Sequence, residues 1–158
     1  MARADLINSA ASFETKLAAV ADRTPFIAEK MLLAGSAILA DEVSRRLHAM
    51  FPDARYQLPS AMGITPVGHD NAGNYNVKIG FGGYQQYVVR ENGGVYWPRK
   101  PAAYQLIARV VENGRKNGPF EIKARPFMSP AVRQTKSAVA DAMQKAAEEA
   151  IEDIQKGI

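Results

Sequence analysis

The sequence predicts an α+β fold, with an antiparallel sheet of three or four strands packed by two N-terminal helices, a short helix and a long C-terminal helix. Two observations support this prediction. Apolar residues recur at three- and four-residue steps near both ends of the chain, and they alternate with polar residues in the middle. No linker or internal repeat divides the 158 residues, so we expect a single domain over 1–158.

The N-terminal third predicts two amphipathic helices, over about residues 4–50. The first has an apolar stripe of Leu6, Ile7, Ala10, Phe13, Leu17 and Val20. Thr24 then provides a hydroxyl suited to an N-cap, and Pro25 suits the first helical position. The second stripe runs to Met50, and Pro52 ends the helix because the residue before a proline is disfavoured in the helical region.

The middle of the chain, residues 53–98, predicts strands. Apolar and polar residues alternate strictly in 74–81, which is the pattern of a half-buried strand. A weaker strand at 64–69 precedes it, and the turn residues of 70–73 predict a hairpin between the two. The run 84–90 predicts a third strand, which 91–94 would close.

Two further helices are expected. Residues 102–113 predict a short helix, with Pro101 in its first turn and Gly114 just after its end. An extended arm, 119–128, then leads to a C-terminal helix at 129–156, with Ser129 as N-cap and Pro130 in the first position. The stripe of this last helix is Val132, Thr135, Val139, Met143, Ala146, Ala150 and Ile154.

Few residues carry the chemistry of a catalytic or metal site. There is no Cys, and His48 and His69 are the only histidines. Neither a nucleophile elbow nor a phosphate-binding glycine loop has the required spacing. We therefore expect no enzyme activity, no cofactor and no metal. No segment approaches the roughly 20 apolar residues of a membrane span, so we expect no membrane partner.

The charge is distributed unevenly along the chain. Residues 90–136 hold 10 basic and 3 acidic side chains, whereas residues 137–158 hold 2 basic and 5 acidic ones. A basic block of this kind attracts nucleic acid, and here Arg99 and Lys100 follow the aromatic Tyr96 and Trp97. The same block would equally suit the acidic helix of a neighbouring copy. A small basic nucleic-acid-binding protein is therefore the alternative to an assembling subunit.

One stretch of the sequence resembles a known family. A helix with Tyr104, Ala108, Val111 and Glu112 is followed by a glycine and then by a Pro-Phe-hydrophobic-x-Pro-Ala step; the remaining matching residues are Gly114, Ala124, Pro126, Phe127, Met128, Pro130 and Ala131. This order resembles the neck, head–tail joining and tail-completion proteins of long-tailed phages and prophages. Asn113 departs from the family, which usually has an aromatic residue there.

The resemblance implies a non-enzymatic structural protein of the virion neck or tail, assembled in the host cytoplasm. Its partners would be copies of itself, in a ring of about six around the DNA channel. Adjacent neck, connector or tail-tube proteins would bind the ring. Arg99, Lys100, Arg115 and Lys116 would make non-specific contact with packaged DNA.

Docking residues are expected around the Pro-Phe step. Pro126 restricts its own backbone and that of Arg125, so Phe127 and Met128 leave the arm at a fixed angle and enter an apolar cleft. That cleft belongs either to the same subunit or to a neighbour. We expect Met128 to pack near Val132 or Arg133, and Glu112 to pair with Arg109 or Arg125. The acidic partners on the terminal helix would include Glu148, Glu149 and Glu152.

Overall fold

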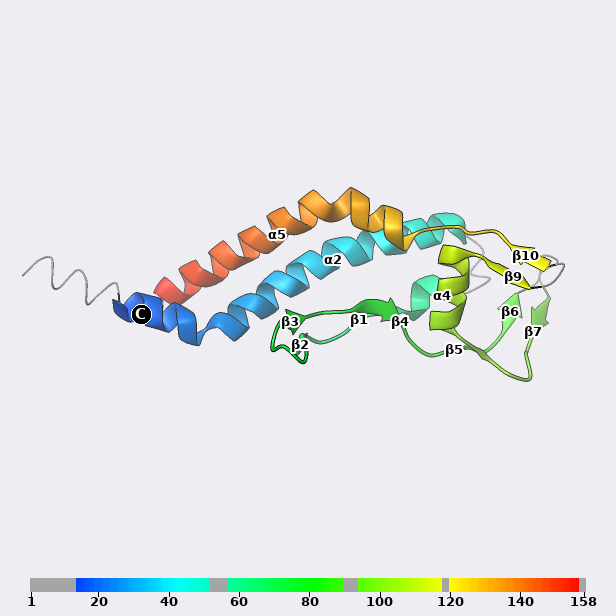
Figure 1. The fold of residues 1–158 in the computed structure, drawn as a ribbon, viewed down its shortest axis with the longest axis horizontal. Coiled ribbons are helices and arrows are strands. Elements are labelled where there is room, and N and C mark those ends of the chain that lie inside the picture. Colours follow the sequence, from blue (N-terminus) through cyan, green and yellow to red (C-terminus); the bar gives the residue numbers. More distant parts are fainter. Residues whose placement is uncertain (1–13, 52–56, 90–93, 118–119, 157–158) are drawn as a thin grey trace, which may run out of the picture.

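The computed structural model describes residues 14–51, 57–89, 94–117 and 120–156. Figure 1 shows an elongated molecule in which two long helices lie side by side and a head of short strands and helices gathers at one end. The prediction of an α+β fold is confirmed as a mixture of helices and antiparallel strands.

The two long helices form an antiparallel hairpin. α2 (Thr24–Met50) and α5 (Met128–Lys156) run in opposite directions, and Lys30 near the start of α2 pairs with Asp153 near the end of α5 at 3.2 Å. Residues 14–22 are also helical and lead into α2. At Gly35 the helices are so close that an added Cβ would lie 2.8 Å from Met143 Cγ. The missing side chain of this glycine therefore sets the spacing of the hairpin.

The strands do not form the predicted sheet of three or four. Within the described residues they make five separate antiparallel pairs. These are β1 (Met62–Ile64) with β4 (Ile79–Phe81), β2 (Gly68–His69) with β3 (Tyr75–Asn76), β5 (Tyr84–Gln85) with β8 (Ala102–Ala103), β6 (Val88–Val89) with β7 (Val95–Tyr96), and β9 (Arg115–Asn117) with β10 (Phe120–Ile122).

The predicted hairpin turn between β2 and β3 is present. Asp70 Oδ1 accepts hydrogen bonds from the amides of Ala72 and Asn74 at 2.9 and 2.8 Å, and Gly73 has a φ of +82°. The expected strand at 84–90 is instead divided, because β5 and β6 pair with different partners. Residues 90–93, which include most of the expected turn at its end, lie outside the described part of the chain.

Two short helices complete the head. α3 (Leu58–Ala61) lies beside α2, and α4 (Tyr104–Asn113) begins two residues later than predicted. Ala102 and Ala103 belong to β8 because they pair with Gln85 and Tyr84. Pro101 therefore precedes a strand and does not open a helix. Gly114 ends α4, as predicted, with a φ of +72°.

Thr24 and Val132 do not have the predicted roles. Arg23 occupies the N-cap position of α2, and the Thr24 hydroxyl donates to the carbonyl of Ala21 at 2.7 Å. Val132 is 47% exposed, whereas its neighbour Ala131 is fully buried. Val132 lies one helical position away from the buried face, so Ala131 begins the apolar stripe of α5.

The main core lies where the base of the helical hairpin meets the head. It draws residues from α2, α3, β4, α4 and α5: Val43, Leu47, Phe51, Leu58, Phe81, Tyr104, Ala108, Phe127 and Ala131. The Tyr104 hydroxyl donates to Gln57 Oε1 at 2.7 Å, so its polar end is satisfied while its ring is buried. This core fixes the position of α4 relative to the start of α5.

Candidate docking site at the joint between α4 and α5

The start of α5 is held by a carboxylate from α4. Glu112 Oε2 accepts hydrogen bonds from the amides of Phe127 and Met128 at 2.7 and 2.9 Å. Its Oε1 accepts from the amide of Ser129 at 3.0 Å and from the Ser129 hydroxyl at 2.6 Å. These contacts, with those of Gly114, Ala124 and Phe127 described below, are called the joint.

Glu112 accounts for all the free amides at the start of this helix. The first intrahelical bond runs from the amide of Ala131 to the carbonyl of Phe127, so the amides of 127–130 have no partner inside α5. Glu112 accepts three of them, and the fourth position is Pro130, which has no N–H. The helix end is therefore fully satisfied without a side-chain N-cap from its own sequence.

The predicted cap and pairing at this position are thus corrected. α5 begins at Met128, Ser129 lies inside it, and Pro130 stands at its third position. Glu112 was expected to pair with Arg109 or Arg125, but its described hydrogen bonds go to the first residues of α5. A carboxylate is favoured there because a helix N-terminus carries a partial positive charge.

The environment of Glu112 favours its ionised form. Partial burial opposes ionisation, but the hydrogen bonds from the Ser129 hydroxyl and from the amides of Met128, Phe127 and Ser129 outweigh it. Together they hold the pKa of Glu112 below its ordinary value. The carboxylate is therefore charged at neutral pH, and its charge is directed at α5.

Gly114 allows the arm to return across the end of α4. Its amide donates to Val110 O at 2.8 Å, and the amide of Arg125 donates to Val111 O at 2.7 Å. A Cβ at position 114 would lie 2.7 Å from Ile122 O and 2.9 Å from Ala124 N. Both the positive φ and this close approach of backbone require glycine.

Phe127 fills the core of its own chain. Its side chain is 1% exposed, and its ring meets that of Phe81 edge-on with centroids 5.9 Å apart. Of the two alternatives for the apolar cleft, the structure therefore shows the one within the subunit. Arg125 and Pro126 are exposed on the arm beside it, where a partner can reach them.

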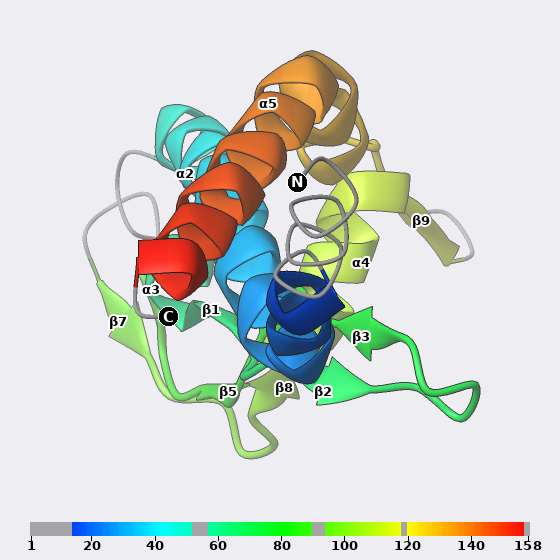
Figure 2. The same cartoon turned by 90° about the vertical axis from the view of Figure 1, so that its left-hand side faces the viewer.

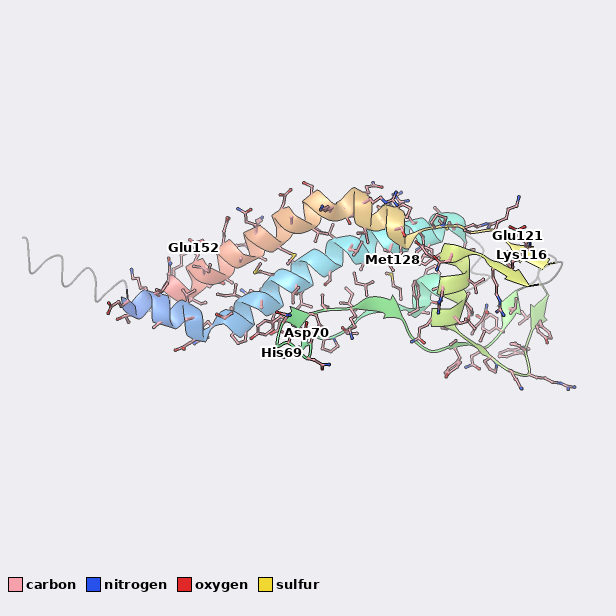
Figure 3. The ribbon with its side chains drawn as sticks, viewed as in Figure 1. His69, Asp70, Lys116, Glu121, Met128 and Glu152 are labelled. Atoms are coloured by element: carbon pink, nitrogen blue, oxygen red, sulfur yellow. The ribbon has the colours of Figure 1, made fainter. Side chains whose placement is uncertain are left out.

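Met128 packs differently from the prediction. It is half-buried against the core and lines a groove of about 290 Å³ with residues of α2, β4 and α5. Among those residues are Leu39, Ile79 and Val139. Figure 3 shows Met128 at the base of α5, close to α4. Its apolar neighbours are thus provided by α2 and the strands, whereas Val132 faces solvent.

The remaining predicted docking residues lie far from the joint. Glu148, Glu149 and Glu152 are exposed near the end of α5. Glu149 and Glu152 pair with Lys145 and Lys156 at 3.8 and 2.7 Å, and Glu148 accepts from Gln144 at 2.8 Å. These are exposed contacts within one helix, so they leave the carboxylates accessible.

The predicted DNA-facing residues are exposed on the head. Arg99 and Lys100 lie in a bend between β7 and β8, and Arg115 and Lys116 lie on β9. Glu121 of β10 stands directly opposite Lys116 in the hairpin, as Figure 3 shows. Lys116 therefore has an acidic neighbour, which weakens the attraction that it would exert on phosphate.

Other kinds of site find little support in the part of the chain that the structure describes. No three His, Asp or Glu side chains gather there as metal ligands would. The Nδ1 of His48 contacts Ser44 O at 2.8 Å, and the ring of His69 lies 4.4 Å from that of Tyr75. None of the described helices combines the length and the apolar character that crossing a bilayer requires.

The sequence alone did not reveal what Glu112 does. Capping motifs are sought within a few residues of a helix start, but this carboxylate lies fifteen positions before the first amide that it accepts. Its position two residues before the glycine that ends α4 was the available signal. No protein-family model, curated protein or solved structure matches this chain.

Proposed function

We propose that this chain is a structural subunit of a phage neck or tail, which assembles as a ring and joins head to tail or completes the tail. The observation that carries the proposal is that residues matching the family pattern form one physical unit. Tyr104, Ala108, Phe127 and Ala131 share the buried core. Glu112 caps α5, and Gly114 lies against Ala124.

This convergence supports the resemblance because a chance match would have no reason to bring its residues together. The pattern describes a joint that orients a long helix, which is a mechanical element and not a reaction site. A subunit that must present fixed surfaces to neighbours needs such a joint, because interfaces depend on shape complementarity in their centre. The proposal is therefore for a protein that acts by docking.

Electron microscopy tests the proposal. We expect rings in preparations of the purified protein, and unjoined heads and tails when phage particles are assembled without its gene. Adding the purified protein to those separated heads and tails should restore joined particles. Normal joined particles in the absence of the gene would refute the proposal.

A second candidate, binding to nucleic acid, is favoured by one surface. Trp97 is 66% exposed, its ring lies 5.3 Å from that of Tyr87, and the exposed cations Arg99 and Lys100 follow it. Aromatic faces beside cations bind single strands by stacking and charge. Micromolar binding to random nucleic acid that weakens steeply with salt and is lost in Trp97→Ala would favour this candidate.

A further inference from the structure

An apolar groove opens on the head between α4 and the β9–β10 hairpin. It has a volume of about 250 Å³, and its walls include Leu106, Ile107, Val110, Val111 and Ile122. Leu106 and Ile122 are 51% and 52% exposed. A second hollow of about 400 Å³ shares Val111 and Ile122 and extends toward Phe51. Exposed apolar side chains that gather in this way mark an interaction surface.

The rim of this head groove is basic. Arg115 lines the first hollow, and Lys123 and Arg125 line the second together with Glu121. The other carboxylate nearby is that of Glu112, which is directed at the start of α5. The groove therefore offers an apolar floor and an excess of positive charge. Its best partner would combine apolar side chains with carboxylates.

The opposite end of the same molecule has that chemistry. We define the tip as residues 14–30 and 145–156, and Figure 2 shows both segments facing the viewer. Leu17 and Phe26 are 59% and 40% exposed there. Four carboxylates of α5 are exposed beside them, against two lysines; the carboxylates are Glu148, Glu149, Glu152 and Asp153.

Within one chain the tip cannot reach the groove. From Met128 at the base of α5 to Glu152 the helix rises about 36 Å, at 1.5 Å per residue. Figure 3 places Glu152 toward one end of the molecule and Lys116 of β9 at the other. Any contact between these two complementary surfaces must therefore join different copies.

We infer that the tip of one copy docks in the head groove of the next copy. Leu17 and Phe26 supply the apolar contact, and the carboxylates at the end of α5 meet the basic rim. The two surfaces differ, so the contact is head-to-tail and continues from copy to copy until a ring closes. This inference rests on the proposed function as an assembling subunit, and it names the surfaces that assemble.

Charge reversal of each surface tests the inference. The head variant is Arg115→Glu with Lys123→Glu, and the tip variant is Glu148→Lys with Glu152→Lys. The control variant, Lys78→Glu with Lys136→Glu, makes the same charge change as the head variant at exposed lysines outside both surfaces. Sedimentation equilibrium measures self-association, and circular dichroism verifies that each variant is folded.

We expect the head and tip variants each to self-associate at least about tenfold more weakly than the parent, because like charges would then face each other. The control should associate as the parent does. A chain that carries both reversals should regain association, since its acidic head groove again faces a basic tip.

A mixture of the head and tip variants identifies the geometry. The intact tip of the head variant fits the intact groove of the tip variant, so the mixture should form dimers but nothing larger. A contact between identical surfaces would give no such dimers. Leu106→Ser should weaken association of the parent, because it removes an apolar contact in the groove.

Association of both reversal variants at the parent's strength would overturn the inference, and so would a parent that stays monomeric at every concentration and salt. This failure is distinct from failure of the proposed function. Joined particles that still require the protein, with both variants active, would reject these surfaces but keep the function. Association through these surfaces without any effect on particles would do the reverse.

Discussion

Replacing Glu112 by alanine should weaken the fold measurably, because it removes the acceptor for three amides and one hydroxyl. The amides of Phe127 and Met128 are part-buried, so water replaces the carboxylate only incompletely. Leaving a buried donor unsatisfied costs about 1–3 kcal/mol, and losing an N-cap typically costs about 1 kcal/mol. Taking the lower half of the first range for each amide gives about 2–3 kcal/mol for the pair.

Thermal and urea unfolding measure this loss. For a chain of this length each kcal/mol lowers Tm by about 2–4 °C, so we expect a decrease of about 5–10 °C. Glu112→Gln should lose less, because one oxygen remains to accept. Glu112→Asp keeps the charge but is one methylene shorter, so a loss close to that of alanine would show that reach matters more than charge.

Glu121→Ala provides the matched control for Glu112→Ala. Its carboxylate is exposed on β10, so we expect a change within about 0.5 kcal/mol. If Glu112→Ala unfolds within the same 0.5 kcal/mol of the parent, the assignment of Glu112 as the cap of α5 is refuted.

The stabilisation by Glu112 should also depend on pH. Its folded-state pKa lies below the ordinary value, so the unfolded chain takes up a proton first as pH falls. The contribution is therefore complete above the ordinary carboxyl pKa and is lost as pH falls through the lowered value. The difference in unfolding free energy between parent and Glu112→Ala should shrink progressively below about pH 4. A difference that grows in acid would contradict this sign.

Three further substitutions test the joint and the helical hairpin. Gly114→Ala should cost about 2–4 kcal/mol, from the positive φ and the contact with Ile122 O, whereas Gly82→Ala, which meets no atom within 4 Å, should be nearly neutral; equal stabilities would contradict the close approach. Phe127→Ala should cost about 3–5 kcal/mol in urea unfolding, and a loss below 1 kcal/mol would show that the ring is not in the core. Gly35→Val should destabilise the hairpin, and adding Met143→Ala should restore part of the loss; strict additivity of the two changes would count against their contact.

Local patterns predicted the long elements of this fold well. The stripe and the Pro130 region placed the C-terminal helix within one residue of its observed start, and Asp70 with Gly73 placed the hairpin turn. Each of these depends on residues that are close in sequence. Periodicity and turn chemistry are sufficient in such cases.

Elements that depend on distant partners were predicted less well. Ala102 and Ala103 favour helix by composition, but pairing with Tyr84 and Gln85 makes them a strand. Pairing outweighs an intrinsic preference that is worth less than about 1 kcal/mol per residue. The same principle explains the divided run 84–90, in which two neighbouring segments find different partners.

The candidate site followed the same division. The residues of the joint were identified from the sequence as a group, but their roles were not. The role of Glu112 depends on the turn at Gly114 and the return of the arm, which together bring a carboxylate from one helix to the end of another. Spacing along the chain carries no record of that route.

The connection between α4 and α5 has a mechanical consequence. α5 spans 29 residues, or about 43 Å at 1.5 Å per residue, and its base is held by hydrogen bonds to a single carboxylate. As with any long lever, a rotation of about 5° at the fulcrum would carry the far end through about 4 Å, which is more than a hydrogen-bond length. The aiming accuracy of the whole arm is thus decided at Glu112, far from anything that the arm touches.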